Sequence, residues 1–495
     1  MEKKKEMFVI IGSLLVIILS VTLAYFTVQI VGKGKEISAS SADLKITFSS
    51  GSGNISSSNI EPGWSSGTST FTVKNESKDT YKYNIVIKDL VNTFVTTGYL
   101  QYKITSADGG YNMSEFKDVP KSTAAKDEIL AYSVEIAKGK THSYSIEFKY
   151  TNSANDQSDD MGKELSGTLY IEKGTLPPTL AEKLLADNPT IKTRTAFNTV
   201  FTETNTGTLY KATESIASST PKDVYYFAGN AKNNWVKFAG FYWRIIRTNH
   251  DGSIRLLYSG TATNTTKGYI GGSTFNSLSD DPMYVGYMYG TDGTLASNRT
   301  NETDSAIKTY IDNWYGNNLS SYTKYISTKA VYCNDRKAPS YNASSSFDYY
   351  VYTRLEAGNP TYDCEDSKDA FSGSNSEAKL TYPIGLMTGD EIAYAGGKSD
   401  EKLSSPYAWY YLNSAGGSVT GSSYWWSLSP MYWRSGNNSS VWVVLGSSYP
   451  GCPDSFVTEG LHGVRPAISL KTCTLWTSGN GAPETPYEIS TTSGC

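Results

Sequence analysis

The residues that could carry chemistry are few and scattered along the chain. The three histidines, His142, His250 and His462, lie far apart, and no metal-ligand spacing joins them to cysteines or carboxylates. A Ser-x-x-Lys motif occurs at residues 321–324 without the companion motifs of acyl-serine enzymes. We therefore expect no catalytic residue and no enzyme activity, and we rank a secreted hydrolase third among the functions considered.

Charged residues also give little sign of a cofactor or of nucleic acid. The acidic pairs Asp159-Asp160 and Asp280-Asp281 are typical of solvated turns. We expect no cofactor and no metal, with calcium at such a pair as the alternative. The net charge is −4, and lysine and arginine cluster only around the N-terminal apolar run. Because phosphate binding needs grouped basic side chains, we exclude nucleic acid as a partner.

Five cysteines lie beyond residue 330, which suits an oxidising compartment. Cys333 and Cys364 bracket one insertion-like loop, and Cys473 and Cys495 bracket the C-terminal tail. Both pairs are candidate disulfides, which leaves Cys452 over. One sequence does not fix the connectivity, so other pairings stay open here.

An uncharged run at residues 7–31 follows three lysines and is long enough for a bilayer span of about 20 residues. We expect residues 1–36 to form a cytoplasmic stub and a transmembrane anchor. The protein would then sit in the cell membrane, single-pass, with its C-terminal part extracellular. Cleavage near residues 38–42, and a type IV prepilin, are the alternatives.

Hydrophobic alternation predicts an antiparallel β-sandwich stalk over residues 37–173. Together with AYFT at 24–27 and ADLKITF at 42–48, this part resembles secreted fibre proteins of the TasA and camelysin class. Residues 174–223 read as a linker with a short helix, which begins at a capping box of Thr179 and Glu182.

A second domain is predicted over residues 224–473, followed by a tail at 474–495. Residues 238–260 form two apolar strands around a turn at 249–252, which indicates a hairpin. Apolar spacing predicts a helix over 304–319 capped by Asp304, and TGDEIAYAG at 388–396 predicts a shorter one. The fold class is therefore mainly β, with an α+β C-terminal domain.

Four phrases in this domain resemble the C-type-lectin-like family of bacterial and phage surface proteins: FYWRII at 241–246, NWY at 313–315, WWSLSP at 425–430 and GVRPAISL at 463–470. The resemblance implies a compact scaffold with a loop-rich binding face near its last strands. In targets of diversity-generating retroelements, that face varies while the framework is kept. The paired reactive cysteines of the formylglycine-generating members are not reproduced by Cys452 and Cys473.

The binding face is expected between residues 431 and 462, where aromatic, charged and amide side chains mix as they do in binding surfaces. Trp425, Trp426 and Arg465 are expected to be scaffold. The candidate ligand-binding residues are Met431, Tyr432, Trp433, Arg434, Asn437, Asn438, Leu445, Ser448, Tyr449, Asp454, Glu459 and His462.

These observations predict a cell-surface recognition or adhesion protein that displays a C-type-lectin-like domain, with binding loops open to diversification. Its partner would be a protein or glycan on another surface, and the N-terminal helix would hold it in the membrane. The alternative is a structural subunit of an extracellular fibre, pilus or biofilm matrix.

Overall fold

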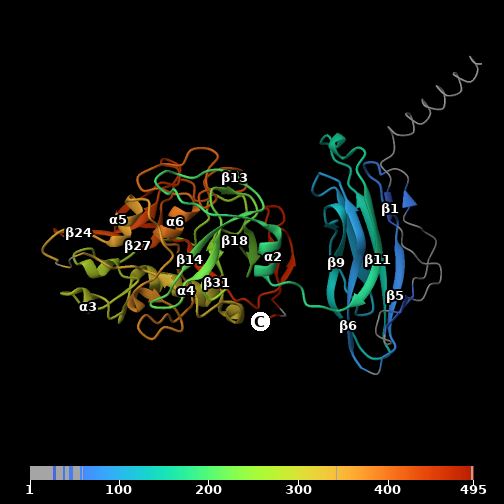
Figure 1. Cartoon of the computed structure of the whole chain (residues 1–495), viewed down its shortest axis with the longest axis horizontal. Coiled ribbons are helices and arrows are strands. Elements are labelled where there is room, and N and C mark those ends of the chain that lie inside the picture. The colour runs from blue at the N-terminus through green and yellow to red at the C-terminus, as the bar shows by residue number, and fades with distance from the viewer. Residues whose placement is uncertain are drawn as a thin grey trace, which may run out of the picture. The chain divides into compact units, whose positions relative to one another are not determined.

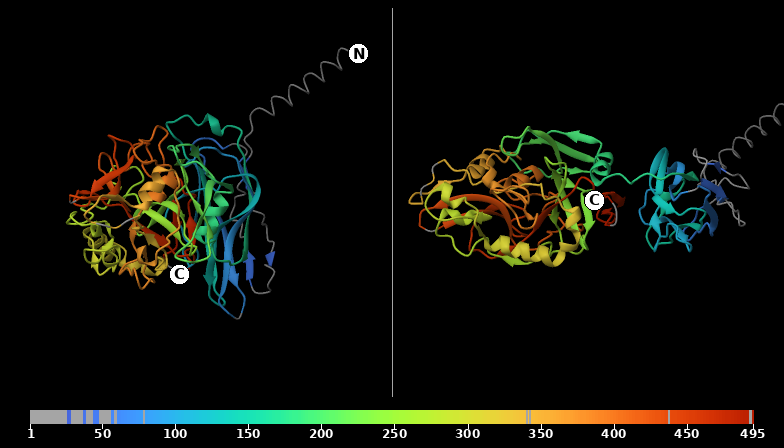
Figure 2. Two further views of the ribbon diagram at one scale, coloured as in Figure 1. Left: turned by 60° about the vertical axis from the view of Figure 1, so that its left-hand side comes forward. Right: turned by 90° about the horizontal axis from the view of Figure 1, so that it is seen from below.

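The computed structural model describes residues 26–28, 37–38, 44–47, 56–57, 60–77, 79–339, 341, 343–436, 438–491 and 494–495. Strand accounts for 37% and helix for 13%, so the protein is mainly β, as predicted. The chain divides into two compact units, which we call unit 1 (Met1–Pro177) and unit 2 (Pro178–Cys495). One connecting segment joins them (Figure 1; right-hand view of Figure 2).

The predicted membrane anchor falls almost wholly outside the described residues. Its described part, Phe26–Val28, is strand β1, which pairs in parallel with β11. Among the residues that the structure describes, no helix combines the length and hydrophobicity that a bilayer span requires.

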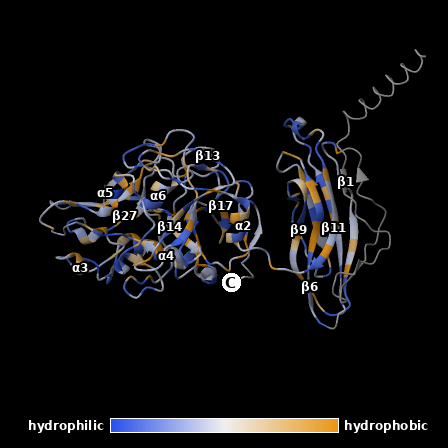
Figure 3. Cartoon of the chain, viewed as in Figure 1, coloured by the Kyte–Doolittle hydropathy of each residue, from blue (hydrophilic) through white to orange (hydrophobic). Residues whose placement is uncertain are grey.

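Unit 1 contains two sheets that share one hydrophobic core. Their strand orders are β4-β1-β11-β6-β9 and β2-β3-β5-β10-β7-β8. Buried and exposed side chains alternate along β5, β7 and β10, and Figure 3 shows hydrophilic and hydrophobic residues interleaved in the strands of this unit. The strands are β2 Ile37–Ser38, β3 Leu44–Thr47, β4 Ser56–Ser57, β5 Ser69–Asn75, β6 Tyr81–Asn92, β7 Leu100–Ser106, β8 Lys117–Asp118, β9 Ser122–Ile136, β10 Thr141–Tyr150 and β11 Leu165–Lys173.

Strand β10 shows why this sequence folds as a sandwich. Every second residue of β10, from His142 to Tyr150, is buried, so one face of the strand joins the core. His142 is part of that face, and its Nδ1 lies 2.9 Å from the Tyr83 hydroxyl. Burial lowers the pKa of His142. This histidine is therefore a packed core residue, which agrees with the absence of a paired-histidine motif around it.

The larger sheet of unit 2 has the order β12-β14-β15-β18-β17-β33-β32, and β19, β31 and β26 extend it from β18. The predicted hairpin is present as β18 and β19, with a turn closed by the Gly252 amide donating to the Asn249 carbonyl. The strands are β12 Thr190–Lys192, β14 Thr208–Glu214, β15 Lys222–Tyr226, β17 Trp235–Phe238, β18 Phe241–Thr248, β19 Ile254–Tyr258, β26 Gly385–Leu386, β31 Pro466–Leu470, β32 Trp476–Ser478 and β33 Tyr487–Ile489.

The segments expected to be linker and tail are built into unit 2. The capping box of Thr179 and Glu182 does start a helix, α2 (Leu180–Asp187), but Leu180 and Leu184 are buried in the unit 2 core. Beyond it, β14 pairs with β15, and β33 of the tail pairs with β17. The Thr- and Ser-rich composition of residues 190–221 indicated a spacer, whereas β14 within them and β33 within the tail each complete the sheet with a few apolar residues.

The smaller sheet of unit 2 has the order β20-β30-β27-β28-β29, with β24 paired to β27. Its strands are β20 Gly272–Ser273, β24 Phe347–Asp348, β27 Trp425–Arg434, β28 Asn438–Val444, β29 Pro453–Val457 and β30 His462–Gly463. Short pairs elsewhere in unit 2 are β13 Thr204–Asn205 with β16 Asn230–Ala231, β21 Met288–Tyr289 with β22 Thr303–Asp304, and β23 Tyr332–Cys333 with β25 Ala370–Phe371.

Two further helices lie where the sequence predicts them, α4 (Ala306–Asn318) and α6 (Gly389–Ala395). The first is α4, where Ser305 rather than Asp304 is the N-cap, because the Ser305 hydroxyl accepts the Lys308 amide while Asp304 pairs with the Lys308 ammonium. The capping box of Thr388 and Glu391 starts the predicted short helix, α6. The remaining helices of unit 2 are α3 Leu295–Asn298 and α5 Tyr350–Glu356, with 3-10 turns at Pro282–Val285, Ser320–Tyr325 and Ser367–Asp369.

Both predicted disulfides, Cys333–Cys364 and Cys473–Cys495, are present, and Cys452 is a buried free thiol. Trp425 and Trp426 lie in the core, at 1% and 0% exposure, which confirms them as scaffold.

Arg465 is scaffold as well. It is fully buried and donates to the carbonyl oxygens of Tyr258, Gly268 and Tyr410. It also lies over the ring of Trp425, and burial lowers its pKa to about 9.

Candidate recognition surface

Strand β27 divides the predicted contact residues between its two faces. Residues 431–434 were expected in a loop, but they are the last four residues of β27. Since successive side chains of a strand point to opposite faces, Met431 and Trp433 turn inward while Tyr432 and Arg434 turn outward.

The outward pair is held in place by its neighbours. The Arg434 guanidinium lies 3.9 Å from the centroid of the Tyr432 ring and donates to the Asp348 carboxylate at 2.7 Å. The Tyr432 hydroxyl lies 3.0 Å from the Ser455 hydroxyl. Tyr432 and Arg434 are only partly exposed, so the surface presents an ordered aromatic and cationic pair rather than two mobile side chains.

Three predicted contact residues lie in the core instead. Met431, Trp433 and Leu445 are 4%, 2% and 7% exposed. Trp433 is also held by its indole N–H, which donates to the Ala343 carbonyl at 3.0 Å. A side chain this deeply packed cannot reach a macromolecule outside, so these three residues support the surface from below.

Other predicted residues are open to solvent. Ser448 and Tyr449 lie in the turn between β28 and β29, where Tyr449 is 55% exposed. Asn438 and Asp454 are partly exposed in β28 and β29, whereas Asn437 lies outside the described residues. Glu459 is exposed in the next turn, and its carboxylate accepts a hydrogen bond from the Ser279 hydroxyl.

His462 lies inside a ring of aromatic side chains at the start of β30. Its ring centroid is 4.2 Å from that of Phe456, 4.9 Å from Trp426 and 5.6 Å from Tyr424. Its Nε2 is buried and has no hydrogen-bond partner among the described residues. Burial therefore lowers the pKa of His462 to about 4. His462 is thus an uncharged, partly buried member of an aromatic cluster at neutral pH.

Gly460 permits this cluster. A β-carbon at Gly460 would lie 2.6 Å from a ring carbon of Phe456 and 2.9 Å from Nε2 of His462. Both rings therefore close over a position that has no side chain.

Exposed apolar side chains next to this cluster were not singled out from the sequence. Phe456 and Leu461 are 37% and 72% exposed, and Leu278 is 44% exposed. The Leu278 carbonyl accepts the Thr458 hydroxyl, which places it beside the same turn. Adjacent exposed apolar groups mark interaction sites more often than isolated ones do. The sequence signal that could have identified this site is Leu461, an apolar residue in a turn that also contains Glu459 and Gly460.

The partly or fully exposed residues of this region are Leu278, Asp348, Tyr432, Arg434, Asn438, Ser448, Tyr449, Asp454, Phe456, Glu459, Leu461 and His462, and we call this set the β27–β30 surface. Tyr432 lies on the Ser455 side of the sheet, whereas Phe456, the next residue of β29, points to the opposite side, so the β27–β30 surface extends over both faces. It combines apolar, aromatic and charged groups along strands β27 to β30. Such a mixture is suited to contact with another molecule.

The acidic pairs have structural partners. The Asp160 carboxylate accepts the Tyr150 hydroxyl and the Val95 amide, and the Asp281 carboxylate caps a 3-10 turn through the Met283 amide. Within the described residues, no group of three or more His, Cys, Asp and Glu side chains is placed to hold a metal ion.

No protein-family model matches the sequence, and no curated protein or solved structure matches it either.

Proposed function

We propose that this chain is a cell-surface recognition or adhesion protein that binds a protein or glycan through the β27–β30 surface. The observation that carries the proposal is the ordered outward pair of Tyr432 and Arg434 on one face of the smaller sheet. Tyrosine and arginine are enriched among the residues that dominate binding energy.

The remainder of the proposal concerns how this surface is displayed. Unit 2 would be a C-type-lectin-like domain, and its strands β27, β28 and β31 would be the framework of a face whose loops are free to vary. Residues 7–25 would anchor the chain in the membrane, and the sandwich of unit 1 would serve as the stalk. A protein so displayed meets its ligand on another cell or particle.

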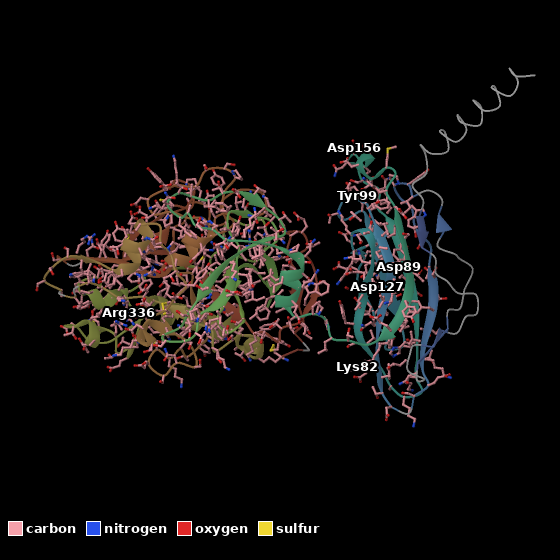
Figure 4. All side chains as sticks on the ribbon, in the orientation of Figure 1. Lys82, Asp89, Tyr99, Asp127, Asp156 and Arg336 are labelled. Carbon is pink, nitrogen blue, oxygen red and sulfur yellow. A yellow bond between two sulfur atoms is a disulfide. The ribbon has the colours of Figure 1, made fainter. Side chains whose placement is uncertain are left out.

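The alternative is a fibre subunit, in which sandwiches polymerise by pairing edge strands. Strand β9 is the last strand of its sheet among the described strands. It carries Lys126, Asp127 and Glu128, and its pairing with β6 shifts register four times. Asp127 accepts the backbone amide of Asp89 at such a shift (both labelled in Figure 4). Charges and bulges on an edge oppose strand addition, which favours the stalk over the fibre.

The test compares two double variants of the full chain displayed on cells. Tyr432→Ala with Arg434→Ala removes the outward pair, and Lys211→Ala with Asp223→Ala removes an exposed ion pair elsewhere in unit 2. Binding to arrays of glycans and surface proteins is measured for both. We expect saturable binding that the first variant loses by about tenfold or more and that the control keeps.

Two outcomes would overturn the proposal. One is equal binding by the two variants, which would place the contact elsewhere. The other is the formation of filaments by the full chain without saturable binding to any surface, which would establish the fibre subunit.

A further inference from the structure

Unit 2 contains a cavity of about 410 Å³ that shares no residue with the β27–β30 surface. Its size falls within the range of small-molecule sites, about 300–1,000 Å³. Four chain segments form its walls: the end of β14, the β18–β19 turn, residues 329–331 and residues 367–375.

The walls are fixed to one another. Cys333 follows directly after the 329–331 wall, and its disulfide to Cys364 joins this part of the chain to the segment that follows α5. Cys364 in turn pairs through its backbone with Ser215 and Ala217 in the wall after β14. Strand β23 also pairs with β25, which lies within the 367–375 wall. The cavity is therefore built into the fold rather than left between mobile loops.

Two polar side chains of the cavity, Asn249 and His250, each leave a hydrogen-bond acceptor free within the part of the chain that the structure describes. Asn249 is 5% exposed, its amide N–H groups donate to Ser253 and Ser469, and its Oδ1 has no partner among the described residues. In His250, Nε2 donates to the Thr220 carbonyl at 2.9 Å, because a carbonyl can only accept. Its Nδ1 is then the ring nitrogen left to accept.

Two carboxylates line the cavity, and they differ in how they are neutralised. Glu214 is buried and pairs with Arg247 at 2.9 Å. Asp251 receives hydrogen bonds from the hydroxyls of Ser253 and Ser327, but it has no ion-pair partner in the described part of the chain. Asp251 therefore brings an uncompensated negative charge to the wall.

Aliphatic residues make up a further part of the lining. They are Ile216, Ala217, Ala330, Val331 and Ala370; Lys329, Ser367, Ser372, Ser374 and Asn375 also line the cavity, and no Phe, Tyr or Trp is among the lining residues. A sugar ring would find no broad aromatic face here for stacking, whereas a methylene chain fits aliphatic walls.

We propose that this cavity binds the end of an aliphatic ammonium or guanidinium group, as on a lysine or arginine side chain. The charged head would donate to the Asp251 carboxylate and to the Asn249 oxygen, and the stem would lie along Ile216 and Val331. A charged donor meets an uncompensated carboxylate more favourably than a neutral hydroxyl does. This site goes beyond the β27–β30 surface and does not depend on it.

Lys329 allows a test of whether the ligand carries a positive or a negative charge. Its exposed side chain also lines the cavity and opposes a cation there. A cationic ligand should therefore bind more weakly to Asp251→Asn and more tightly to Lys329→Ala. An anionic ligand would show the reverse, and a neutral one would respond little to either change.

The probes are N-acetyl-lysine methylamide, N-acetyl-arginine methylamide and the uncharged N-acetyl-norleucine methylamide, titrated into the full chain by calorimetry or NMR. We expect the two cations to bind and norleucine not to. Asp251→Asn should weaken the binding of both cations by about tenfold. Lys329→Ala should tighten them by about twofold.

Two further variants complete the design. Asp292→Asn removes an exposed carboxylate away from the cavity and should change nothing. Ser374→Trp fills the exposed rim of the cavity and should abolish binding even where Asp251→Asn fails to fold. Equal binding of norleucine and lysine probes would overturn the proposal, as would weaker cation binding by Lys329→Ala or undiminished binding by Ser374→Trp.

Discussion

His462 is a titratable group whose surroundings are almost entirely aromatic, and its pKa falls from 6.5 to about 4 through burial. The unfolded chain then takes up the proton at a higher pH than the folded chain. Between pH 6.5 and 4, the unfolded state therefore binds more protons, and stability declines as the pH falls. Below about pH 4 this contribution becomes constant, since His462 is protonated in both states.

We expect His462→Gln to remove that part of the pH dependence. The unfolding free energy of unit 2 in the wild type should decrease by about 1 kcal/mol more than in the variant as pH falls through this window, less than the full shift implies because the ring is partly exposed. Denaturant titrations at several pH values would measure it. Parallel profiles for the two proteins would contradict the prediction.

Residue types alone do not show which residues between 431 and 462 reach solvent. Tyr432 and Trp433 are adjacent, large and aromatic, so their residue types alone predict the same role for both. In β27, however, Tyr432 points outward and Trp433 points inward. The strand was not foreseen because residues 431–434 precede a loop of serines and asparagines. Leu278 lies 180 residues before Thr458 in the chain, and the hydrogen bonds that join its segment to Thr458 are not encoded by any local pattern.

The elements with a complete local signal were the ones the sequence predicted. The β18–β19 hairpin, α2 and α6 each carry their own turn or capping residues. By contrast, β14 and β33 have few apolar residues and take their stability from partners elsewhere in the chain. Their neighbours could not be deduced without the sheet order.

At this scale, the Cys333–Cys364 disulfide links separate wall elements of the cavity. It closes a separation of 31 residues, so its removal should destabilise unit 2 by about 3 kcal/mol. We expect the double variant Cys333→Ala, Cys364→Ala to unfold at a lower denaturant concentration and to lose binding of the lysine probe.

The second disulfide offers a matched control. Cys473–Cys495 closes a separation of 22 residues, which predicts a stability loss of similar size. Its removal should leave probe binding unchanged, because this disulfide joins two segments that are not walls of the cavity. If both double variants lost probe binding equally, the effect would be general loosening of unit 2 rather than a change in the cavity walls.

For the whole molecule, the separation into two units has consequences for how it unfolds. The core of unit 1 is built from residues such as Phe71, Tyr83 and Ile146, and the main core of unit 2 from residues such as Trp433 and Trp426. The two sets have no member in common. Each unit thus has the hydrophobic core that an independently folding domain requires.

We therefore expect two unfolding transitions in calorimetry, each sensitive to its own core. Phe71→Ala should lower the midpoint temperature of the unit 1 transition, and Trp433→Ala that of the unit 2 transition, by roughly 5 to 15 °C. The reason is that truncating a buried aromatic residue costs about 3–5 kcal/mol of stability. Tyr432→Ala, one residue from Trp433 but on the outward face, should lower neither by more than about 3 °C. If Phe71→Ala moved both transitions together, the two cores would be thermodynamically coupled. A stalk that carries a separate binding domain would then be the wrong description, because the domain could not be varied without cost to the stalk.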